Sequence, residues 1–261
     1  MFMSNFRVVY KYFVHFFTAR NTRGFGVHSP FLFRFTRFVL CEKHSYYIFR
    51  KIEALRSKLK NDKRVLEIKD VGTGLDRNAS IQSIARKSLK SAKYGQLLFR
   101  IANYFKARNI LELGTSLGVT TAYLATNTIE INCVSLEGCP QIAAVANENL
   151  HKFGIANVEI IVGNIDDTLP KALSQFDKLD LIFIDANHKS ESVLNYFNLC
   201  LSRIHNESIV VVDDIYWSKD MEFAWNQIKN HSHVTSTIDL FQVGIVFFNT
   251  DLHINHYKMR Y

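Results

Sequence analysis

The sequence predicts an α/β fold built on a seven-stranded, mostly parallel sheet that ends in an antiparallel hairpin. From residue 109 onward, strand-like and helix-like segments alternate, which is the pattern of a parallel sheet with helices on both faces. The last two expected strands, 233–239 and 243–249, are joined only by Leu240-Phe-Gln242, which is too short for a parallel crossover. A basic, phenylalanine-rich segment precedes this alternation and predicts a helical cap.

The individual elements follow from hydrophobic periodicity and turn residues. Before the sheet, Ser29 and Pro30 predict an N-cap and the first turn of a helix, and Val71 to Gly74 is expected to be a loop. Other early elements are a helix through Phe2–Phe16, helices at 46–60, 81–89 and 93–107, and a short strand at 65–69. The earlier strands of the sheet are expected near 110–113, 131–136, 157–162, 179–184 and 208–213, with helices at 117–127, 140–153, 166–174, 190–203 and 217–230.

Composition limits the class of protein. The chain has 261 residues, of which 48% are hydrophobic and 21% charged, so it is globular rather than disordered. Its cysteines include no C-x-x-C pair, which argues against a zinc knuckle or a disulfide framework and favours a reducing, cytoplasmic compartment; they are Cys41, Cys133, Cys139 and Cys200. The sequence has no uncharged apolar run of about 18 residues, so we expect no transmembrane helix.

The N-terminal part differs from the rest of the chain in charge. Residues 1–64 hold 14 Lys and Arg against three acids, a net charge of +11, whereas the rest of the chain carries a net charge of −3, which gives the total of +8. This asymmetry predicts a helical extension over 1–64 and a separate domain over 65–261. The apolar stripe of the first helix favours a cap that buries its Phe side chains while Arg7 and Lys11 face solvent. Peripheral contact with a membrane and a nucleic-acid arm are the alternatives.

A glycine turn between an expected strand and helix is the centre of the predicted site. The stretch Asn109-Ile-Leu-Glu-Leu-Gly-Thr-Ser-Leu-Gly118 places the acid Glu112 just before the first glycine. Such a turn can present backbone N–H groups and lets a ligand approach the main chain closely. The spacing from Gly114 to Gly118 differs from the dinucleotide fingerprint G-x-G-x-x-G, because Ser116 stands where the middle glycine would fall.

Further acids follow successive expected strands, and parallel strands bring their carboxyl ends to one edge of a sheet. Glu137 is placed to accept hydrogen bonds from the two hydroxyls of a ribose. Asp185, Asp213 and Asp214 supply oxygen ligands of the kind that Mg²⁺ or Ca²⁺ prefers. The adjacent Asp213 and Asp214 cannot both point the same way from a regular strand, so one is expected in the loop.

The pattern E-L-G-x-x-x-G-x-[ST], present from Glu112 to Thr120, resembles motif I of the class I S-adenosylmethionine-dependent methyltransferases, especially the catechol and caffeoyl-CoA O-methyltransferase branch. The resemblance covers about residues 91–249 and implies a Rossmann-like fold with S-adenosylmethionine as cofactor. It also implies cofactor contacts by the turn and the later strand ends, namely by Glu112, Gly114, Thr115, Ser116, Gly118, Glu137, Gly138, Asn164, Ile165 and Asp185.

The same resemblance implies O-methylation of a small-molecule acceptor, with Asp185 and His188 as catalytic residues. Metal-dependent members typically carry a lysine three residues after the aspartate, and here that position holds His188. An imidazole is a suitable base near neutral pH, since its ordinary pKa is about 6.5. Asp185, Asp213 and Asp214 would hold Mg²⁺ or another divalent cation. An RNA methyltransferase, a non-catalytic cofactor-binding module and an NAD-dependent enzyme are the alternatives, and a homodimer is left open.

Overall fold

The structure is a computed structural model that describes residues 2–68 and 77–261, with side chains described from residue 6 onward. The expected loop from Val71 to Gly74 lies outside the described residues. The chain forms two compact units. Residues 43–177 make up one of them, here called the continuous unit, and residues 1–42 together with 178–261 make up the other, here called the split unit.

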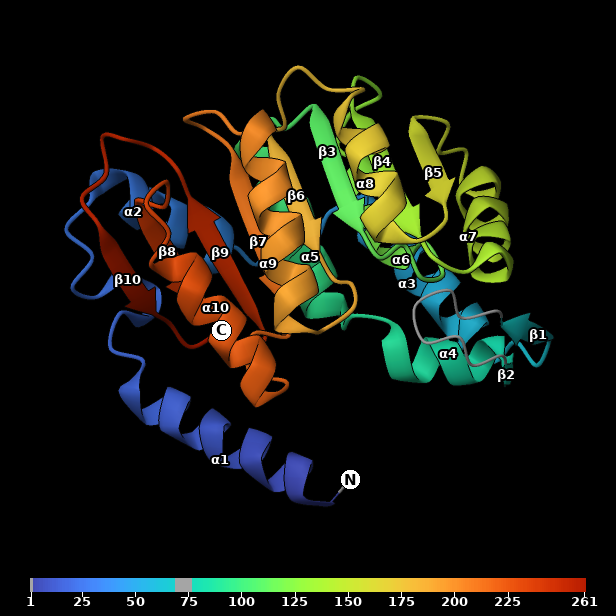
Figure 1. Cartoon of the computed structure of the whole chain (residues 1–261), viewed down its shortest axis with the longest axis horizontal. Helices are drawn as coiled ribbons and strands as arrows, with labels where there is room; N and C mark the ends of the chain where they lie inside the picture. The colour runs from blue at the N-terminus through green and yellow to red at the C-terminus, as the bar shows by residue number, and fades with distance from the viewer. Residues whose placement is uncertain (1, 69–76) are drawn as a thin grey trace. The chain divides into compact units, whose positions relative to one another are not determined.

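Three parallel strands form the centre of the continuous unit: β3 (Asn109–Leu113), β4 (Asn132–Glu137) and β5 (Val158–Val162). Figure 1 shows them side by side in green and yellow. The pairing register sets Glu112 opposite Ser135. Apolar β3 residues such as Ile110 and Leu111 are fully buried, as expected for a strand covered on both faces.

Helices connect these strands and precede them. Pro140 begins α7 at a position where its missing N–H costs nothing, and the side chain of Asn164 caps α8. An antiparallel pair, β1 (Val65–Ile68) and β2 (Arg77–Ser80), stands apart from the three strands. The helices are α3 (Tyr47–Leu59), α4 (Ile81–Ser88), α5 (Ala92–Tyr104), α6 (Val119–Ala125), α7 (Pro140–Lys152) and α8 (Ile165–Leu173).

The split unit holds five strands: β6 (Leu181–Ile184), β7 (Ile209–Asp213), β8 (Ser236–Asp239), β9 (Val243–Phe247) and β10 (Asn255–Lys258). β6 and β7 are parallel, whereas β9 is antiparallel to both β7 and β8, so the predicted terminal hairpin is confirmed. β10 pairs in parallel with β8 and was not predicted. Its sequence, Asn-His-Tyr-Lys, has no apolar run, and only Tyr257 is buried.

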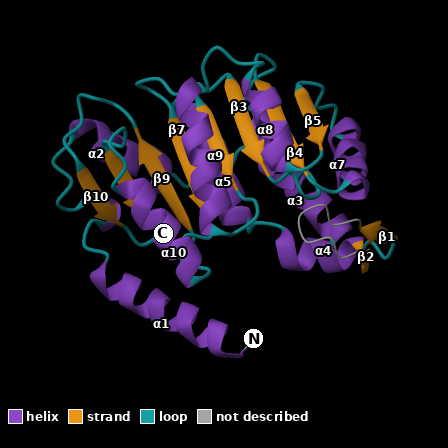
Figure 2. Ribbon diagram, in the orientation of Figure 1, coloured by secondary structure: helices purple, strands orange, loops and turns teal. Residues whose placement is uncertain are grey.

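The helices of the split unit are shown in Figure 2. The predicted N-cap is present, because the hydroxyl of Ser29 accepts a hydrogen bond from the N–H of Leu32 at 3.4 Å. The elements are α1 (Phe2–Thr18), the 3₁₀ turn η1 (Thr22–Gly24), α2 (Pro30–Phe35), the π-helical turn η2 (Thr36–Leu40), α9 (Ser190–Cys200), the 3₁₀ turn η3 (Leu201–Arg203) and α10 (Lys219–Lys229).

The orientation of α1 is opposite to the prediction. Its basic side contacts the rest of the split unit, where Arg7 and Lys11 each pair with Glu222 of α10 at 2.6 Å. Its apolar stripe is exposed instead, with Phe6 at 77% and Phe13 at 53% exposure. The predicted burial of the Phe stripe is therefore wrong for the described side chains, because an acid on α10 attracts the cationic side of the helix.

The α/β fold with mostly parallel strands is confirmed. Besides the separate β1–β2 pair, the described residues form eight sheet strands rather than the expected seven, and β10 is the additional one. The compact units do not divide at residue 64, since residues 1–42 cluster with 178–261, and the predicted domain assignment stays a prediction. Among the described residues, no helix has both the length and the apolar character needed to cross a membrane.

Candidate functional site

The turn after β3 has the backbone conformation that its glycines predict. Gly114 and Gly118 have φ values of 102° and 78°, in the left-handed region that favours glycine, and Ser116 between them has a φ of 49°. A Cβ at Gly118 would lie 3.3 Å from the Cα of Ala146 in α7. Glycine at position 118 is therefore required both by the conformation of the turn and by the close approach of α7.

The backbone N–H groups of this turn are used within the protein. Those of Gly114 and Thr115 donate to the carbonyl of Leu136 at 3.0 and 3.1 Å, and that of Gly118 donates to the carbonyl of Thr115 at 3.0 Å. The N–H of Ser116 donates to a carboxylate oxygen of Glu137 at 2.9 Å. These four N–H groups are therefore engaged within the protein, and the expectation that the turn also presents N–H groups to a ligand stays a prediction.

Glu112 stabilises the turn through a network of buried hydrogen bonds. It is fully buried, and one of its carboxylate oxygens accepts hydrogen bonds from the hydroxyls of Thr121 and Ser135. Ser135 is in turn hydrogen-bonded to the buried hydroxyl of Thr115. This burial does not agree with direct cofactor contact by the side chains of Glu112 and Thr115. The network could have been anticipated, because parallel pairing in register places Ser135 opposite Glu112.

Glu137 ends β4 with a half-buried carboxylate. Its Oε2 accepts from the N–H of Ser116 and its Oε1 accepts from the N–H of Cys139 at 3.0 Å. These two hydrogen bonds fix the orientation of the carboxylate. A Cβ at the neighbouring Gly138 would meet nothing within 4 Å, which leaves open space beside the carboxylate.

Asn164 and Ile165 lie where β5 leads into α8. The side chain of Asn164 accepts from the N–H of Asp166 at 3.2 Å, so Asn164 caps α8. The capping oxygen leaves its amide N–H groups for other partners. Asn164 and Ile165 are both half-buried, which agrees with the predicted contact to the cofactor.

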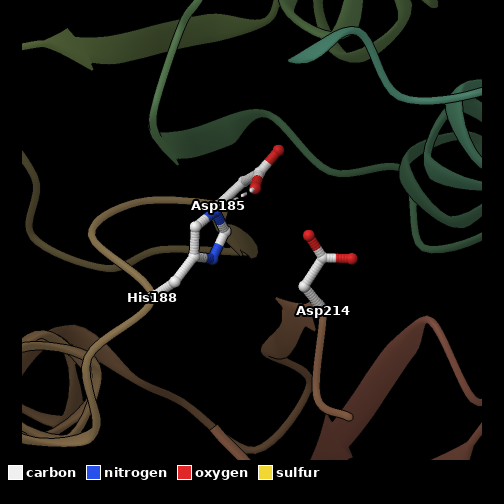
Figure 3. A group of neighbouring side chains, drawn as sticks. All are labelled: Asp185, His188 and Asp214. Carbon is white, nitrogen blue, oxygen red and sulfur yellow. Dashed lines mark ion pairs between the residues drawn. The ribbon is translucent and has the colours of Figure 1, made fainter. Parts of the chain in front are cut away.

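In the split unit, a cluster of three side chains follows the ends of β6 and β7. Asp185, His188 and Asp214 each offer a ligand atom, and these atoms lie within 4.8 Å of one another (Figure 3). The Nε2 atom of His188 is 3.9 Å from Oδ1 of Asp185. All three side chains are half-buried, so they remain accessible to a ligand.

The backbone at this cluster adopts uncommon conformations. Asn187 and His188 have φ values of 67° and 47°, and Asp214 has a φ of 51°. Left-handed conformations cost free energy at residues other than glycine, and they gather at functional sites where the surrounding structure enforces them. The N–H of His188 donates to the carbonyl of Ala186 at 2.9 Å, which holds the tight turn that carries the imidazole.

A further contact fixes this loop to α10. Asp220 accepts hydrogen bonds from the hydroxyl and the N–H of Ser190 at 2.7 and 2.6 Å. These hydrogen bonds, the hydroxyl first, hold the pKa of Asp220 below its ordinary value, with a smaller opposing effect of burial. The contact joins α10 to the residue two positions beyond His188.

The adjacent aspartates separate as predicted. Asp213 is the last residue of β7, is 1% exposed and pairs with Val243 of β9, whereas Asp214 lies in the loop. The cluster therefore contains His188 in the place that the sequence assigned to Asp213 among the metal ligands. A set of two carboxylates and an imidazole suits Mn²⁺ or Zn²⁺ better than Mg²⁺, which prefers oxygen ligands alone.

Tyr216 and Trp217 follow the cluster and differ in exposure. Tyr216 is buried and donates from its hydroxyl to Asp239 at 2.6 Å. Burial, and next the neighbouring Asp239, raise the pKa of Tyr216 well above its ordinary value. Trp217 is 60% exposed and is therefore available to a ligand.

Comparison with known proteins finds similarity to methyltransferases over part of the chain. Residues 111–215 match a family model described as a methyltransferase domain. Over 127 residues the chain is 35% identical to a catechol O-methyltransferase of Mycobacterium tuberculosis, covering 48% of this chain and 56% of that protein. A catechol O-methyltransferase of Niastella koreensis is 32% identical over 128 residues, covering 48% and 57%. The matched region thus spans just over half the length of these curated relatives.

Solved structures agree with the fold. Cofactor-bound Rv0187 from MTB superposes with a TM-score of 0.59 at 23% identity, covering 76% of this chain and 89% of that chain. The O-methyltransferase TomG of Streptomyces achromogenes, solved in complex with SAM, gives a TM-score of 0.55 at 25% identity, covering 62% and 82%. The predicted Rossmann-like fold is confirmed by these likenesses.

Proposed function

We propose that this chain, whose residues 111–215 match a methyltransferase domain, is a class I S-adenosylmethionine-dependent enzyme that transfers a methyl group to a hydroxyl oxygen of a small molecule. The observation that supports the proposal is the group formed by Asp185, His188 and Asp214, in which an imidazole lies beside two half-buried carboxylates. The similarity of the matched region to catechol O-methyltransferases supports an aromatic hydroxyl as the acceptor.

The continuous unit would hold the methyl donor. Glu137 is oriented by two backbone N–H groups and would accept the ribose hydroxyls of S-adenosylmethionine. The amide of Asn164 and the side chain of Ile165 would contact the adenine. The left-handed Gly114 lets the methionine part approach the backbone, since no Cβ stands in the way. Glu112 would act through the turn rather than by touching the donor.

The split unit would supply the acid–base chemistry. S-adenosylmethionine supplies an electrophilic methyl group on a sulfonium, so a new O–CH₃ bond forms as the S–CH₃ bond breaks and S-adenosylhomocysteine leaves. His188 would take the proton of the acceptor hydroxyl, and Asp185 would stabilise the resulting imidazolium. The rate would come mainly from holding the hydroxyl oxygen against the methyl group.

A divalent cation fits the same residues. Two carboxylates and an imidazole, with ligand atoms within 4.8 Å of one another, are a suitable donor set for a transition-metal ion. A bound cation would lower the pKa of the acceptor hydroxyl and orient it. His188 cannot bind a metal and accept a proton through Nε2 at the same time. The proposal therefore has two versions: in one His188 is the base, and in the other it is a metal ligand.

The experiment is transfer of a labelled methyl group to catechol by the wild-type chain, by His188→Ala and by a control, His253→Ala, whose side chain is exposed. We expect catechol methylation by the wild type and the control, and loss of it in His188→Ala. No methylation of catechol or related hydroxyls by a chain that binds S-adenosylhomocysteine would refute the proposal. Titration with a chelator separates the two versions, since only the ligand version loses activity when metal is removed.

A further inference from the structure

α1 has two faces of opposite character, and its polar face is fixed to the split unit. Arg7 and Lys11 both pair with Glu222, and Arg7 also donates to the carbonyl of Tyr216 at 3.1 Å. One turn further along, the buried His15 lies 3.1 Å from the carbonyl oxygen of Met259. These contacts recur every fourth residue along one side of the helix, so they determine which side of α1 faces outward.

The opposite side of α1, here called the aromatic face, is exposed. Its members are Phe6, Val9, Tyr10, Phe13, Phe16 and Phe17. Their exposures range from 39% at Phe16 to 78% at Phe17. Large apolar side chains at helical spacing are normally buried, and a contiguous exposed group of them marks an interaction surface. Turning this face inward would break the ion pairs of Arg7 and Lys11.

The surroundings of the aromatic face are cationic. Residues 1–41 contain six Lys and Arg and no Asp or Glu. Since Arg7 and Lys11 are paired with Glu222, the exposed cations that follow directly after the C-terminal end of α1 are Arg20 and Arg23. The guanidinium of Arg260 lies 4.9 Å from the ring centroid of Phe16, which places one more positive charge at the border of the face.

We propose that the aromatic face of α1 binds the surface of an anionic phospholipid bilayer. Phe and Tyr rings are the side chains that enter the boundary between headgroups and acyl chains, and arginines beside them pair with lipid phosphates. The helix would lie in the plane of the interface, because its polar face is held by α10. The described part of the chain would thus rest on a membrane without crossing it.

The charges favour this occupant over two others. A second copy of the chain would bring a segment with the same excess of arginine against the first, and like charges repel. A nucleic acid would bind best to a basic face, but the basic face of α1 is turned inward to Glu222. A bilayer with anionic lipids offers both an apolar layer for the rings and negative charge for the arginines.

The test is sedimentation of the full chain with lipid vesicles at about 0.15 M salt. One set contains phosphatidylcholine alone, and the other contains about 30% phosphatidylglycerol. The variant Phe13→Glu/Phe17→Glu places two charges on the aromatic face. The matched control, Ile129→Glu/Ile254→Glu, adds the same charges at positions that are 88% and 75% exposed elsewhere. Circular dichroism verifies that α1 stays folded in both variants.

We expect the wild type and the control to sediment with the anionic vesicles, and the Phe variant to bind at least about tenfold more weakly. Arg20→Gln/Arg23→Gln should weaken binding to anionic vesicles and leave the weak binding to neutral vesicles unchanged. The proposal is overturned if the wild type stays in the supernatant or if the control loses binding equally. It is also overturned if the Phe variant abolishes a dimer seen by analytical ultracentrifugation, or RNA binding seen by gel shift, while vesicle binding is unchanged.

Discussion

The carboxylates of the continuous unit and those of the split unit lie in different surroundings. Glu112 is fully buried among the hydroxyls of Thr121 and Ser135, and Glu137 accepts from two backbone N–H groups. Asp185 and Asp214 are half-buried next to an imidazole, on loops with left-handed backbone conformations. The first pair is bound into the turn that it supports, whereas the second pair is accessible at a strained backbone.

This difference indicates that Glu112 and Glu137 shape the donor site, whereas Asp185 and Asp214 take part in the chemistry. Hydrogen bonds that a carboxylate makes to its own chain stabilise the fold and fix its orientation. Backbone strain in an accessible loop points to function, because it lowers the stability of the fold. We therefore expect substitutions in the two units to affect different quantities: stability or donor affinity in one, turnover in the other.

The largest effect is expected at His188. Replacing His188 with Ala removes the base or metal ligand, and kcat should fall by about a hundredfold to ten-thousandfold. Its side chain is 38% exposed, so the free energy of unfolding should change little. The measurement is single-turnover methyl transfer across pH, with His253→Ala as control. Unchanged kcat, with the acidic limb of the pH profile intact, would remove His188 from the mechanism.

A large loss of stability is expected at Glu112. Glu112→Ala leaves two buried hydroxyls without their acceptor and opens a small cavity, which should lower the free energy of unfolding by about 2–4 kcal/mol. Urea unfolding followed by circular dichroism measures this change. Stability equal to the wild type, together with loss of donor binding, would show that Glu112 acts on the ligand directly.

An intermediate effect on donor affinity is expected at Glu137. Glu137→Gln removes the charge and one acceptor oxygen, so binding of S-adenosylhomocysteine should weaken by about tenfold to a hundredfold. Calorimetry measures it, with Glu159→Gln on the exposed side of β5 as control. An affinity within error of the wild type would refute the assignment of the ribose to Glu137.

Gly118 tests the construction of the turn. Gly118→Ala forces a side chain into the left-handed region and toward Ala146, and should cost about 1–3 kcal/mol of stability. Gly138→Ala is the matched control, because its Cβ would meet nothing within 4 Å. Thermal unfolding distinguishes the two. Equal stability of both variants would mean that α7 moves away freely.

The smallest effect is expected at Asp220, which holds the loop after His188 to α10. Asp220→Asn weakens the contact with Ser190, and kcat should fall a few-fold with no change in donor affinity. The pKa of Asp220 is lowered in the folded protein, so the contribution of its ionised carboxylate to the stability of the fold is complete above the ordinary aspartate pKa. That contribution is lost as the pH falls below that value. A wild-type rate in Asp220→Asn would show that the contact is dispensable.

Much of the fold could be predicted because local patterns and tertiary packing agree. Alternating apolar strands and capped helices located β3 through β9 within a few residues. β10 was not predicted, because its sequence is polar and it forms a strand only by pairing with β8 in the folded chain. α1 was oriented wrongly because an apolar stripe predicts burial only when nothing competes, and Glu222, more than 200 residues away, attracts the opposite side.

The site was predicted in part for a similar reason. Sequence order placed Asp185 and Asp214 after strands, and parallel pairing of β6 with β7 brings their ends together. His188 joins the group of possible metal ligands because the backbone is left-handed at Asn187, and the pattern of strands and helices in the sequence did not predict this turn. N–H groups of the turn donate to Leu136 and Glu137 of β4, and these contacts depend on how β4 pairs with β3. The glycine motif alone therefore does not show which N–H groups are already engaged.

The central claim is that Glu137 binds the methyl donor while His188 acts in turnover. Calorimetric titration of S-adenosylhomocysteine into Glu137→Gln and His188→Ala, with methyl transfer to catechol measured on the same preparations, tests it most directly. We expect weakened binding in Glu137→Gln alone, and loss of turnover at saturating donor in His188→Ala alone. Weakened binding in His188→Ala with full turnover at saturating donor, or unchanged binding in Glu137→Gln, would contradict it.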